Sequence, residues 1–462
     1  MATSQHSNDN FAAPSLLLLS APSRPTTRAV LHAAYRSPVA AALSRLGQHG
    51  SGVAPILVIA VAGSVLAPDD RTDRPGFVRW KISQELLAEL YTIIASLCSE
   101  RAVHDEANRG KCDDVEARVV LVQYERCATK PEAHNRPYSH PRASSETVVL
   151  DLSTFAATVR PWKTIFHASS ECGHELVAAY LARVQGQPKF LQDQIIAVDS
   201  GMAFSDSGST PERYGIGTAT TQDLASAAQD TEGIIRGHET VCLGGTFDHL
   251  HSGHKLLLEA AALLLRIPVD SGSCTMIIGV SGEKLLKNKE YAEEIQPWDA
   301  RARCILTFLS TVFGAPTTSE VPVTTVRDEH GSPTSISELQ AKFRDGAVLA
   351  RCVKIQDPLG PTISEEAIDA IVASTETRGG AVVINSKRTA RGWRPLKIYE
   401  VDLLDATQTE DVRHGNFGGR EQQEPNIARP GSSESSTLAA KISSTEIRKR
   451  KAEARKFYLV SR

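Results

Sequence analysis

Cysteine pairs of the metal-binding kind are missing from this sequence of 462 residues. The eight cysteines are scattered and no two form a CxxC pair, which argues against structural zinc or a disulfide scaffold and fits a reducing compartment. No apolar run reaches the roughly 20 residues that a membrane-spanning helix needs. The net charge is only −3, so no basic excess predicts nonspecific binding to nucleic acid. The sequence therefore predicts a globular protein with neither nucleic acid nor membrane as partner.

Acidic residues are missing from residues 11–68, although this stretch carries several arginines. An acid-poor, arginine-containing N-terminus is typical of a mitochondrial transit peptide, but a partly disordered tail before a basic helix has the same composition. The four leucines Leu16–Leu19 are too few for the core of a secretory signal. We therefore expect a cytoplasmic protein, with a mitochondrial location as the alternative.

The apolar pattern divides the chain into two α/β parts. Residues 1–50 are expected to form a loosely ordered tail, and residues 51–195, where strand and helix patterns alternate, a smaller α/β domain of unknown role. Residues 196–236 are rich in serine, threonine and glycine, which is typical of a linker. Residues 237–462 are expected to form the larger domain, in which residues 411–437 have few apolar side chains and predict a mobile loop.

The segment VCLGGTFDHLHSGHK, residues 241–255, contains the clearest indication of a ligand site. An apolar strand ends in Gly244 and Gly245, and an alanine- and leucine-rich helix follows the histidines. Ligands of open α/β sheets bind where strands end, and the free N–H groups of a helix start attract phosphate. His251 and His254 are three residues apart and fall on one face of the helix. The segment therefore predicts a site that binds a polyphosphate.

The GTFD and HxGH elements resemble the signature of the nucleotidylyltransferase superfamily, which also contains the class I aminoacyl-tRNA synthetases. The resemblance implies a Rossmann-like catalytic domain with a parallel sheet, preceded here by a separate smaller α/β domain. It implies ATP binding by Gly245, Phe247, His251 and His254, and a catalytic role for His254, His251 and Thr246. A solvated loop with two surface histidines is the alternative, which the strand before the motif and the helix after it disfavour.

A second element, ISSTEIR at residues 442–448, opens a basic helix near the end of the sequence. Ser443 and Glu446 have the spacing of a capping box, which by itself indicates an ordinary helix start. The element resembles the ISSTxxR motif of phosphopantetheine adenylyltransferases, whereas synthetases carry a lysine-rich KMSKS that this chain lacks. The resemblance implies that four residues bind the β- and γ-phosphates of ATP: Ser443, Ser444, Thr445 and Arg448.

Elements between these motifs follow the order of the eukaryotic type of this family, and the resemblance covers roughly residues 238–462. Three lysines after the second predicted strand are candidates for binding the acceptor phosphate: Lys284, Lys287 and Lys289. A solvated charge run is the alternative for each, and the resemblance favours Lys287 as a catalytic and acceptor-binding residue. Thr246 and Arg378 are the other implied phosphopantetheine-binding residues. Bacterial members carry Arg-Gly-Leu-Arg where this chain has Arg-Gly-Gly-Ala, so only Arg378 matches.

The implied activity is the transfer of AMP from ATP to 4′-phosphopantetheine, giving dephospho-coenzyme A and pyrophosphate in coenzyme A biosynthesis. The acceptor phosphate is largely dianionic at pH 7 and needs no general base. Mg²⁺ is the expected cofactor, on the phosphates of ATP, and no protein metal site is expected. A GxxxxGK[ST] loop is missing, so no phosphate-binding loop of a fused kinase is indicated.

Two other functions stay open at this point. The chain could be a nucleotidylyltransferase with another phosphate acceptor. It could also be a scaffold that binds other enzymes of the coenzyme A pathway through its N-terminal domain, alone or alongside catalysis.

Overall fold

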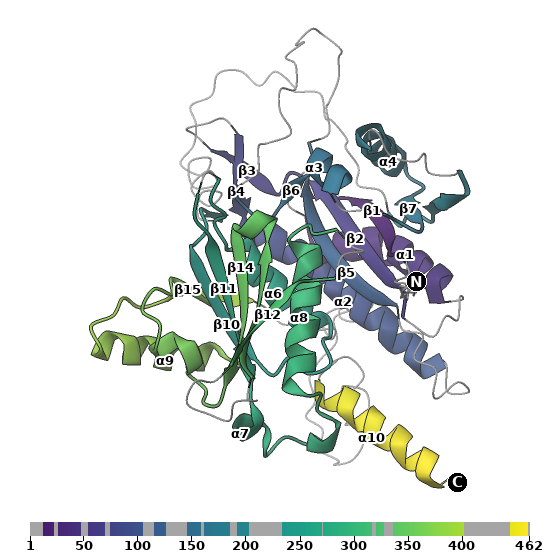
Figure 1. Ribbon diagram of the computed structural model, residues 1–462. Coiled ribbons are helices and arrows are strands. Elements are labelled where there is room, and N and C mark those ends of the chain that lie inside the picture. The colour runs from purple at the N-terminus through teal and green to yellow at the C-terminus, as the bar shows by residue number, and fades with distance from the viewer. Residues whose placement is uncertain are drawn as a thin grey trace, which may run out of the picture.

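The computed structural model describes thirteen segments of the chain, namely residues 13–22, 26–47, 54–69, 74–104, 115–125, 146–158, 161–184, 192–202, 233–269, 271–316, 320–327, 336–401 and 444–460. These segments form two large α/β sheets and one small sheet (Figure 1). No helix among them is long and apolar enough to cross a membrane. The predicted α/β fold with parallel sheets is confirmed.

The N-terminal sheet has six strands, and every neighbouring pair in it is parallel. Its order is β6-β5-β2-β1-β7-β8. The strands are β1 (Ser15–Ser20), β2 (Ile56–Gly63), β5 (Glu116–Gln123), β6 (Leu150–Asp151), β7 (Ile165–Ala168) and β8 (Ile195–Val198). The connecting helices are α1 (Arg28–Gly47), α2 (Trp80–His104), α3 (Leu152–Thr158) and α4 (Glu171–Arg183). A parallel sheet needs such crossover helices and is covered by them.

The interpretation of residues 1–50 as a loosely ordered tail is wrong for the greater part of that stretch. Leu16–Leu19 lie in β1, at most 2% exposed, between β2 and β7. A short apolar run is what a strand buried on both faces requires, and this one was too short to stand out as a signal core. The following α1 packs on α2 and buries one side of its surface. The acid-poor composition therefore belongs to a folded strand and helix, and the N-terminal unit extends from residue 15 rather than 51.

The expected linker is also shorter than residues 196–236. Its first residues complete β8 at the edge of the N-terminal sheet. Its last residues form β9 (Ile234–Ile235), which pairs with β4 (Arg74–Arg79), itself paired with β3 (Leu66–Asp69), in the small sheet. Residues 203–232 lie outside the described segments, as do residues 411–437.

The C-terminal sheet has seven strands in the order β12-β13-β14-β11-β10-β15-β16. The strands are β10 (Thr240–Gly245), β11 (Cys274–Ser281), β12 (Val323–Arg327), β13 (Ile336–Phe343), β14 (Val348–Ile355), β15 (Ala370–Ser374) and β16 (Lys397–Val401). Pairs from β14 to β16 are parallel, whereas β12 and β13 form an antiparallel edge. The helices are α6 (Ser252–Leu263), α7 (Glu283–Leu286), α8 (Trp298–Val312), α9 (Arg378–Ala390) and α10 (Ser444–Val460).

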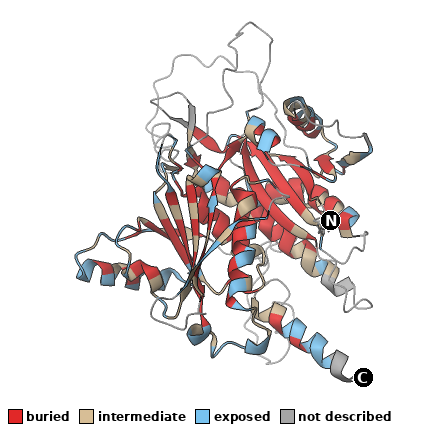
Figure 2. Cartoon of the chain, viewed as in Figure 1, coloured by how far each residue is buried: buried red, intermediate tan, exposed pale blue. Residues whose placement is uncertain are grey.

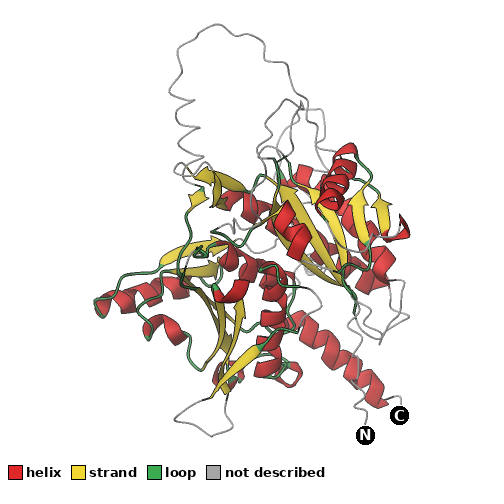
Figure 3. Ribbon diagram, turned by 45° about the horizontal axis from the view of Figure 1, so that its top comes forward, coloured by secondary structure: helices red, strands yellow, loops and turns green. Residues whose placement is uncertain are grey.

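The two large sheets are separate, but they share one hydrophobic core. Helices α2 and α6 pack against each other, and Leu87 and Leu90 of α2 belong to the same buried cluster as Leu256 and Ala260 of α6. Figure 2 shows buried residues running through both sheets and the helices between them. Helix α10 projects away from this body in Figures 1 and 3, and Figure 2 shows exposed residues along it. The N-terminal unit is therefore packed directly on the helix that carries the HxGH histidines.

Candidate active site

Strand β10 lies in the middle of the C-terminal sheet, and the chain turns sharply where it ends. Phe247 and His249 adopt left-handed backbone conformations, with φ of 51° and 46°. Such conformations cost about 1–3 kcal/mol in a non-glycine residue and concentrate at functional sites, where the surroundings hold them. His251 is the N-cap of α6, which starts at Ser252. The predicted sequence of strand, turn and helix is confirmed, although the helix begins at Ser252, before His254 rather than after it.

The two HxGH histidines form a stacked pair at the start of α6. The rings of His251 and His254 have centroids 3.8 Å apart and are inclined by 23°, and Phe247 lies 5.3 Å from His254. A side chain at Gly253 would come within 3.3 Å of the His251 ring, so the glycine leaves room for it. Both Nδ1 atoms are buried with no hydrogen-bond partner among the described residues. Buried polar atoms without partners are uncommon and mark places where a function must be sought.

Both histidines are neutral at pH 7. Burial and, to a smaller extent, the nearby charge of Lys255 lower the pKa of His251 to about 4. Burial also lowers the pKa of His254 well below its usual range, with a smaller contribution from His251. A neutral imidazole has one N–H and can donate it to an anionic oxygen. The positive end of the α6 dipole favours an anion at the same place.

Ser444, the first residue of α10, connects the two motifs. Its Oγ donates a hydrogen bond to the carbonyl of Asp248 at 3.1 Å and lies 3.3 Å from Nε2 of His251. Ser444 and His251 are 193 positions apart in the sequence. Thr445 follows on α10, whereas Ser443 lies outside the described segments. The HxGH and ISSTxxR elements therefore lie side by side, with Ser444 as the residue that makes the contact.

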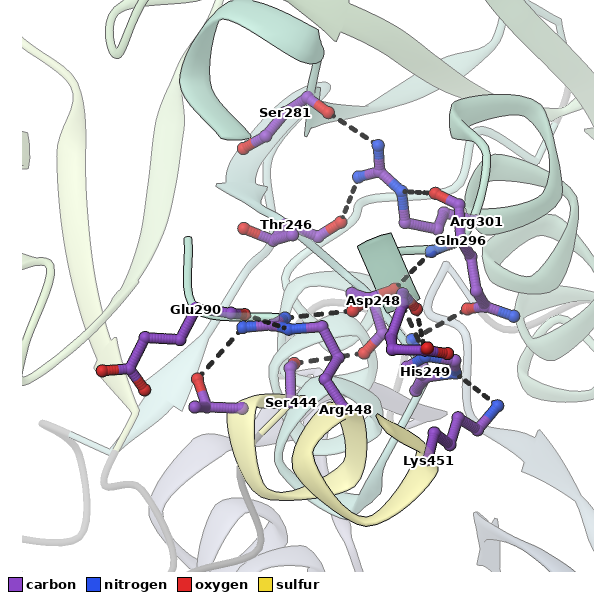
Figure 4. Close-up of polar contacts among 12 residues, drawn as sticks. Thr246, Asp248, His249, Ser281, Glu290, Gln296, Arg301, Ser444, Arg448 and Lys451 are labelled. Carbon is purple, nitrogen blue, oxygen red and sulfur yellow. Dashed lines mark hydrogen bonds and ion pairs between the residues drawn. The ribbon is translucent and has the colours of Figure 1, made fainter. Parts of the chain in front are cut away.

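A buried ion pair holds α10 against the motif (Figure 4). Nη1 of Arg448 is 3.0 Å from Oδ2 of Asp248, and the two side chains are 2% and 0% exposed. Arg448 also donates to the carbonyl of Glu290 and to Oγ1 of Thr445. The backbone N–H of Gln296 donates to the other oxygen of Asp248. In this structure the guanidinium of Arg448 binds residues of the chain, and the expected contact of Arg448 with ATP stays a prediction.

Arg301 of α8 is a site residue that the sequence analysis missed. It is 1% exposed and donates to the carbonyls of Thr246, Ser281 and Gln296, at 2.6, 2.9 and 3.0 Å (Figure 4). Thr246 follows β10, Ser281 is the last residue of β11, and Gln296 precedes α8. One side chain therefore connects three segments at the C-terminal ends of the strands. The carbonyl of Gly245 also accepts a bond from Ser281 Oγ. Arginine is mostly exposed in proteins, so no local pattern identifies a buried one.

The chain is similar to a family model over its N-terminal part and to several named relatives over part of its length. Residues 1–204 match a family model described as a domain of unknown function, DUF8446. An uncharacterised protein of Schizosaccharomyces pombe is 33% identical over 174 residues, which cover 38% of this chain and 43% of that protein. Phosphopantetheine adenylyltransferase of Saccharomyces cerevisiae is 31% identical over 207 residues, 45% of this chain and 47% of the relative. The enzyme of that name from Pyrococcus abyssi is 30% identical over 164 residues, 36% of this chain and 78% of the relative.

The chain belongs to the phosphopantetheine adenylyltransferase family. It spans less than half the length of the two fungal relatives that it matches, and more than three quarters of the archaeal one. The match to a domain of unknown function ends close to the end of the N-terminal sheet.

The residues expected to bind the acceptor lie near the C-terminal ends of the strands that flank β10. Lys287 is exposed and caps the end of α7, just after β11. Arg378 is the first residue of α9 after β15, 65% exposed, with Nε 3.4 Å from Glu400. Both β11 and β15 are parallel neighbours of β10, so all three strands end on one side. Lys284 and Lys289 are exposed as well, and the roles of the three lysines stay predictions.

The lowered histidine pKa values predict a loss of stability in mild acid. Unfolded histidine has a pKa near 6.5, so between pH 6.5 and about 4 the unfolded chain binds protons that folded His251 does not. The free energy of unfolding should therefore fall by about 1.5 kcal/mol from pH 6.5 to 5 through His251 alone. Urea unfolding of the wild type and of His251→Asn at both pH values measures this. An equally steep fall in the variant would contradict the assignment.

Proposed function

We propose that the chain is a pantetheine-phosphate adenylyltransferase, which transfers AMP from ATP to 4′-phosphopantetheine and releases pyrophosphate. The observation that carries the proposal is the contact of Ser444 with His251 and Asp248, because it joins the two nucleotide motifs at one helix start. Family membership and the exposed cations at the same sheet edge support it.

In this proposal the reaction is an in-line displacement at the α-phosphorus of ATP. An oxygen of the phosphopantetheine phosphate forms the new P–O bond, and the bond to the β-phosphate oxygen breaks as pyrophosphate leaves. The acceptor is already anionic, so catalysis consists of positioning and of stabilising charge on the α-phosphoryl oxygens. His254 and His251 donate N–H bonds there, and the Thr246 hydroxyl lies between acceptor and α-phosphate. Lys287 binds the acceptor phosphate and Arg378 reduces the repulsion between the two anions.

The triphosphate is proposed to lie over the start of α6 and to extend toward the start of α10. Gly245 and Phe247 form the floor of the ATP site, and Ser443, Ser444 and Thr445 bind the outer phosphates. Mg²⁺ enters with ATP as part of the substrate. Within the described segments no group of three or more His, Cys, Asp or Glu side chains could hold a metal ion.

The test is direct incubation of the purified chain with ATP, Mg²⁺ and 4′-phosphopantetheine, with mass spectrometry for dephospho-coenzyme A. Parallel reactions replace ATP by CTP and phosphopantetheine by phosphocholine. Dephospho-coenzyme A in the first reaction alone supports the proposal. A product only with another nucleotide or acceptor would make the chain a different nucleotidylyltransferase, and no product with any pair would overturn the enzymatic assignment.

A further inference from the structure

A buried lysine connects the catalytic helix to the N-terminal sheet. Lys255 directly follows His254 on α6, and only 8% of its side chain is exposed. Its Nζ donates to the carbonyl of Ala117 on β5 at 2.9 Å and lies 3.6 Å from Oε1 of Glu116. Burying an ammonium group is costly unless it is paired and hydrogen-bonded, and both partners here come from the unit of unknown role. Lys255 thus makes a polar contact between the two halves of the chain, one residue after His254.

The main chain of the same lysine closes the first turn of α6. Its N–H donates to the carbonyl of His251 at 3.0 Å. No loop therefore separates the Lys255 side chain, which binds β5, from the stacked rings of His251 and His254. A shift or rotation of α6 relative to β5 would move both imidazoles with it.

A second polar contact lies one turn further along α6. Oε2 of Glu259 accepts a hydrogen bond from the hydroxyl of Tyr91 on α2 at 3.0 Å, and the N–H of Val119 on β5 donates to that hydroxyl at 3.3 Å. Lys255 and Glu259 are four residues apart and so lie on one face of α6. In the first turn of α6 this face contacts β5 directly through Lys255. In the second turn it contacts β5 through Tyr91 of α2, which binds Glu259.

We propose that Lys255 is a positioning residue, which sets the place of His251 and His254 by fixing the first turn of α6 to the carbonyl of Ala117. The N-terminal sheet is then part of the active-site scaffold rather than an independent module. The expected effect on kcat rests on the proposed adenylyl transfer, whereas the expected effect on the positions of the two histidine rings does not. A displacement of about 1 Å in a catalytic group can cost on the order of a hundredfold in rate.

The alternative is that the contact only contributes to stability. Removing one partner of a fully buried ion pair is costly, but the Glu116 side chain is 37% exposed and also pairs with Arg118, so the loss of Lys255 leaves no buried charge unpaired. Lys255→Met is therefore a sharp test, because methionine fills the space and removes the donor. If stability alone is at stake, a folded Met variant should keep the wild-type kcat.

The experiment measures kcat and both KM values for Lys255→Met at a temperature at which circular dichroism shows it folded. We expect kcat to fall about tenfold to a hundredfold, with each KM within about threefold of wild type. The matched control is Arg344→Met. Arg344 also donates from the C-terminal half to a carbonyl of the N-terminal half, that of Val148, but it precedes the start of β14, at the end of the sheet opposite the histidines. It should keep the wild-type kcat, and a wild-type kcat in Lys255→Met would overturn the proposal.

A second readout does not depend on activity. The ring C–H signals of His251 and His254, assigned by NMR with His251→Asn and His254→Asn variants, should shift in Lys255→Met and stay in place in Arg344→Met. Unmoved signals in Lys255→Met overturn the positioning role even if adenylyl transfer is never detected. If the Met variant does not fold, Lys255→Gln, one atom shorter but still a donor, takes its place. It should give a smaller loss of kcat and a shift of the same signals, and wild-type values in both would overturn the proposal.

Discussion

Replacing His254 by alanine should lower kcat for adenylyl transfer by about 10²–10³-fold, or roughly 3–4 kcal/mol of transition-state stabilisation. The reason is that His254 lies in the first turn of α6, neutral and stacked on His251, where its N–H can meet charge that develops on the α-phosphoryl group. Because the interaction strengthens in the transition state, KM for ATP should change much less than kcat. Steady-state kinetics with both substrates varied measures the two effects.

Two further substitutions identify the nitrogen that donates. In His254→Gln the amide N–H lies near the position of Nε2, and in His254→Asn near that of Nδ1. The more active of these two variants therefore indicates which ring nitrogen donates. His174→Ala is the matched control, because this histidine is exposed on α4 of the N-terminal unit. A kcat close to wild type in His254→Ala would remove His254 from the catalytic assignment.

The local parts of the site could be predicted because their signals are contiguous. The apolar run before Gly244, the glycine pair and the alanine- and leucine-rich stretch after His254 define β10 and α6 without any long-range information. The same reasoning failed for Leu16–Leu19, since a run of four leucines has no periodicity and its burial comes from two neighbouring strands. Sequence pattern thus predicted the unit that carries the histidines, but not the extent of the sheet packed behind it.

Partners far apart in sequence could not be predicted. Asp248 and Arg448 are 200 positions apart, and the capping-box spacing near Arg448 gave no indication that its guanidinium would be buried. Arg301 and Lys255 are further examples, since both are basic residues whose partners are backbone carbonyls of other segments. A carbonyl has no sequence signature, so such contacts emerge only from the tertiary arrangement.

Arg448→Met should destabilise the protein by about 3–5 kcal/mol, because it leaves the carboxylate of Asp248 buried without its cation. Urea unfolding without nucleotide measures the loss. Arg450→Met is the matched control on the same helix, where an exposed i,i+4 pair with Glu446 should contribute no more than about 0.5 kcal/mol. In the double variant Asp248→Asn with Arg448→Met, part of the loss should be recovered, since the unpaired charge is gone.

The same variant separates the buried ion pair from direct ATP binding by Arg448. A charge-assisted bond to a substrate phosphate contributes about 1.5–3 kcal/mol, so its removal raises KM for ATP while the free protein stays stable. If Arg448→Met loses less than about 1 kcal/mol of stability and raises only KM for ATP, the guanidinium must leave Asp248 when nucleotide binds. The buried, hydrogen-bonded pair predicts the opposite result. In that case Arg448 holds α10 and Ser444 against His251, and it acts on ATP through them.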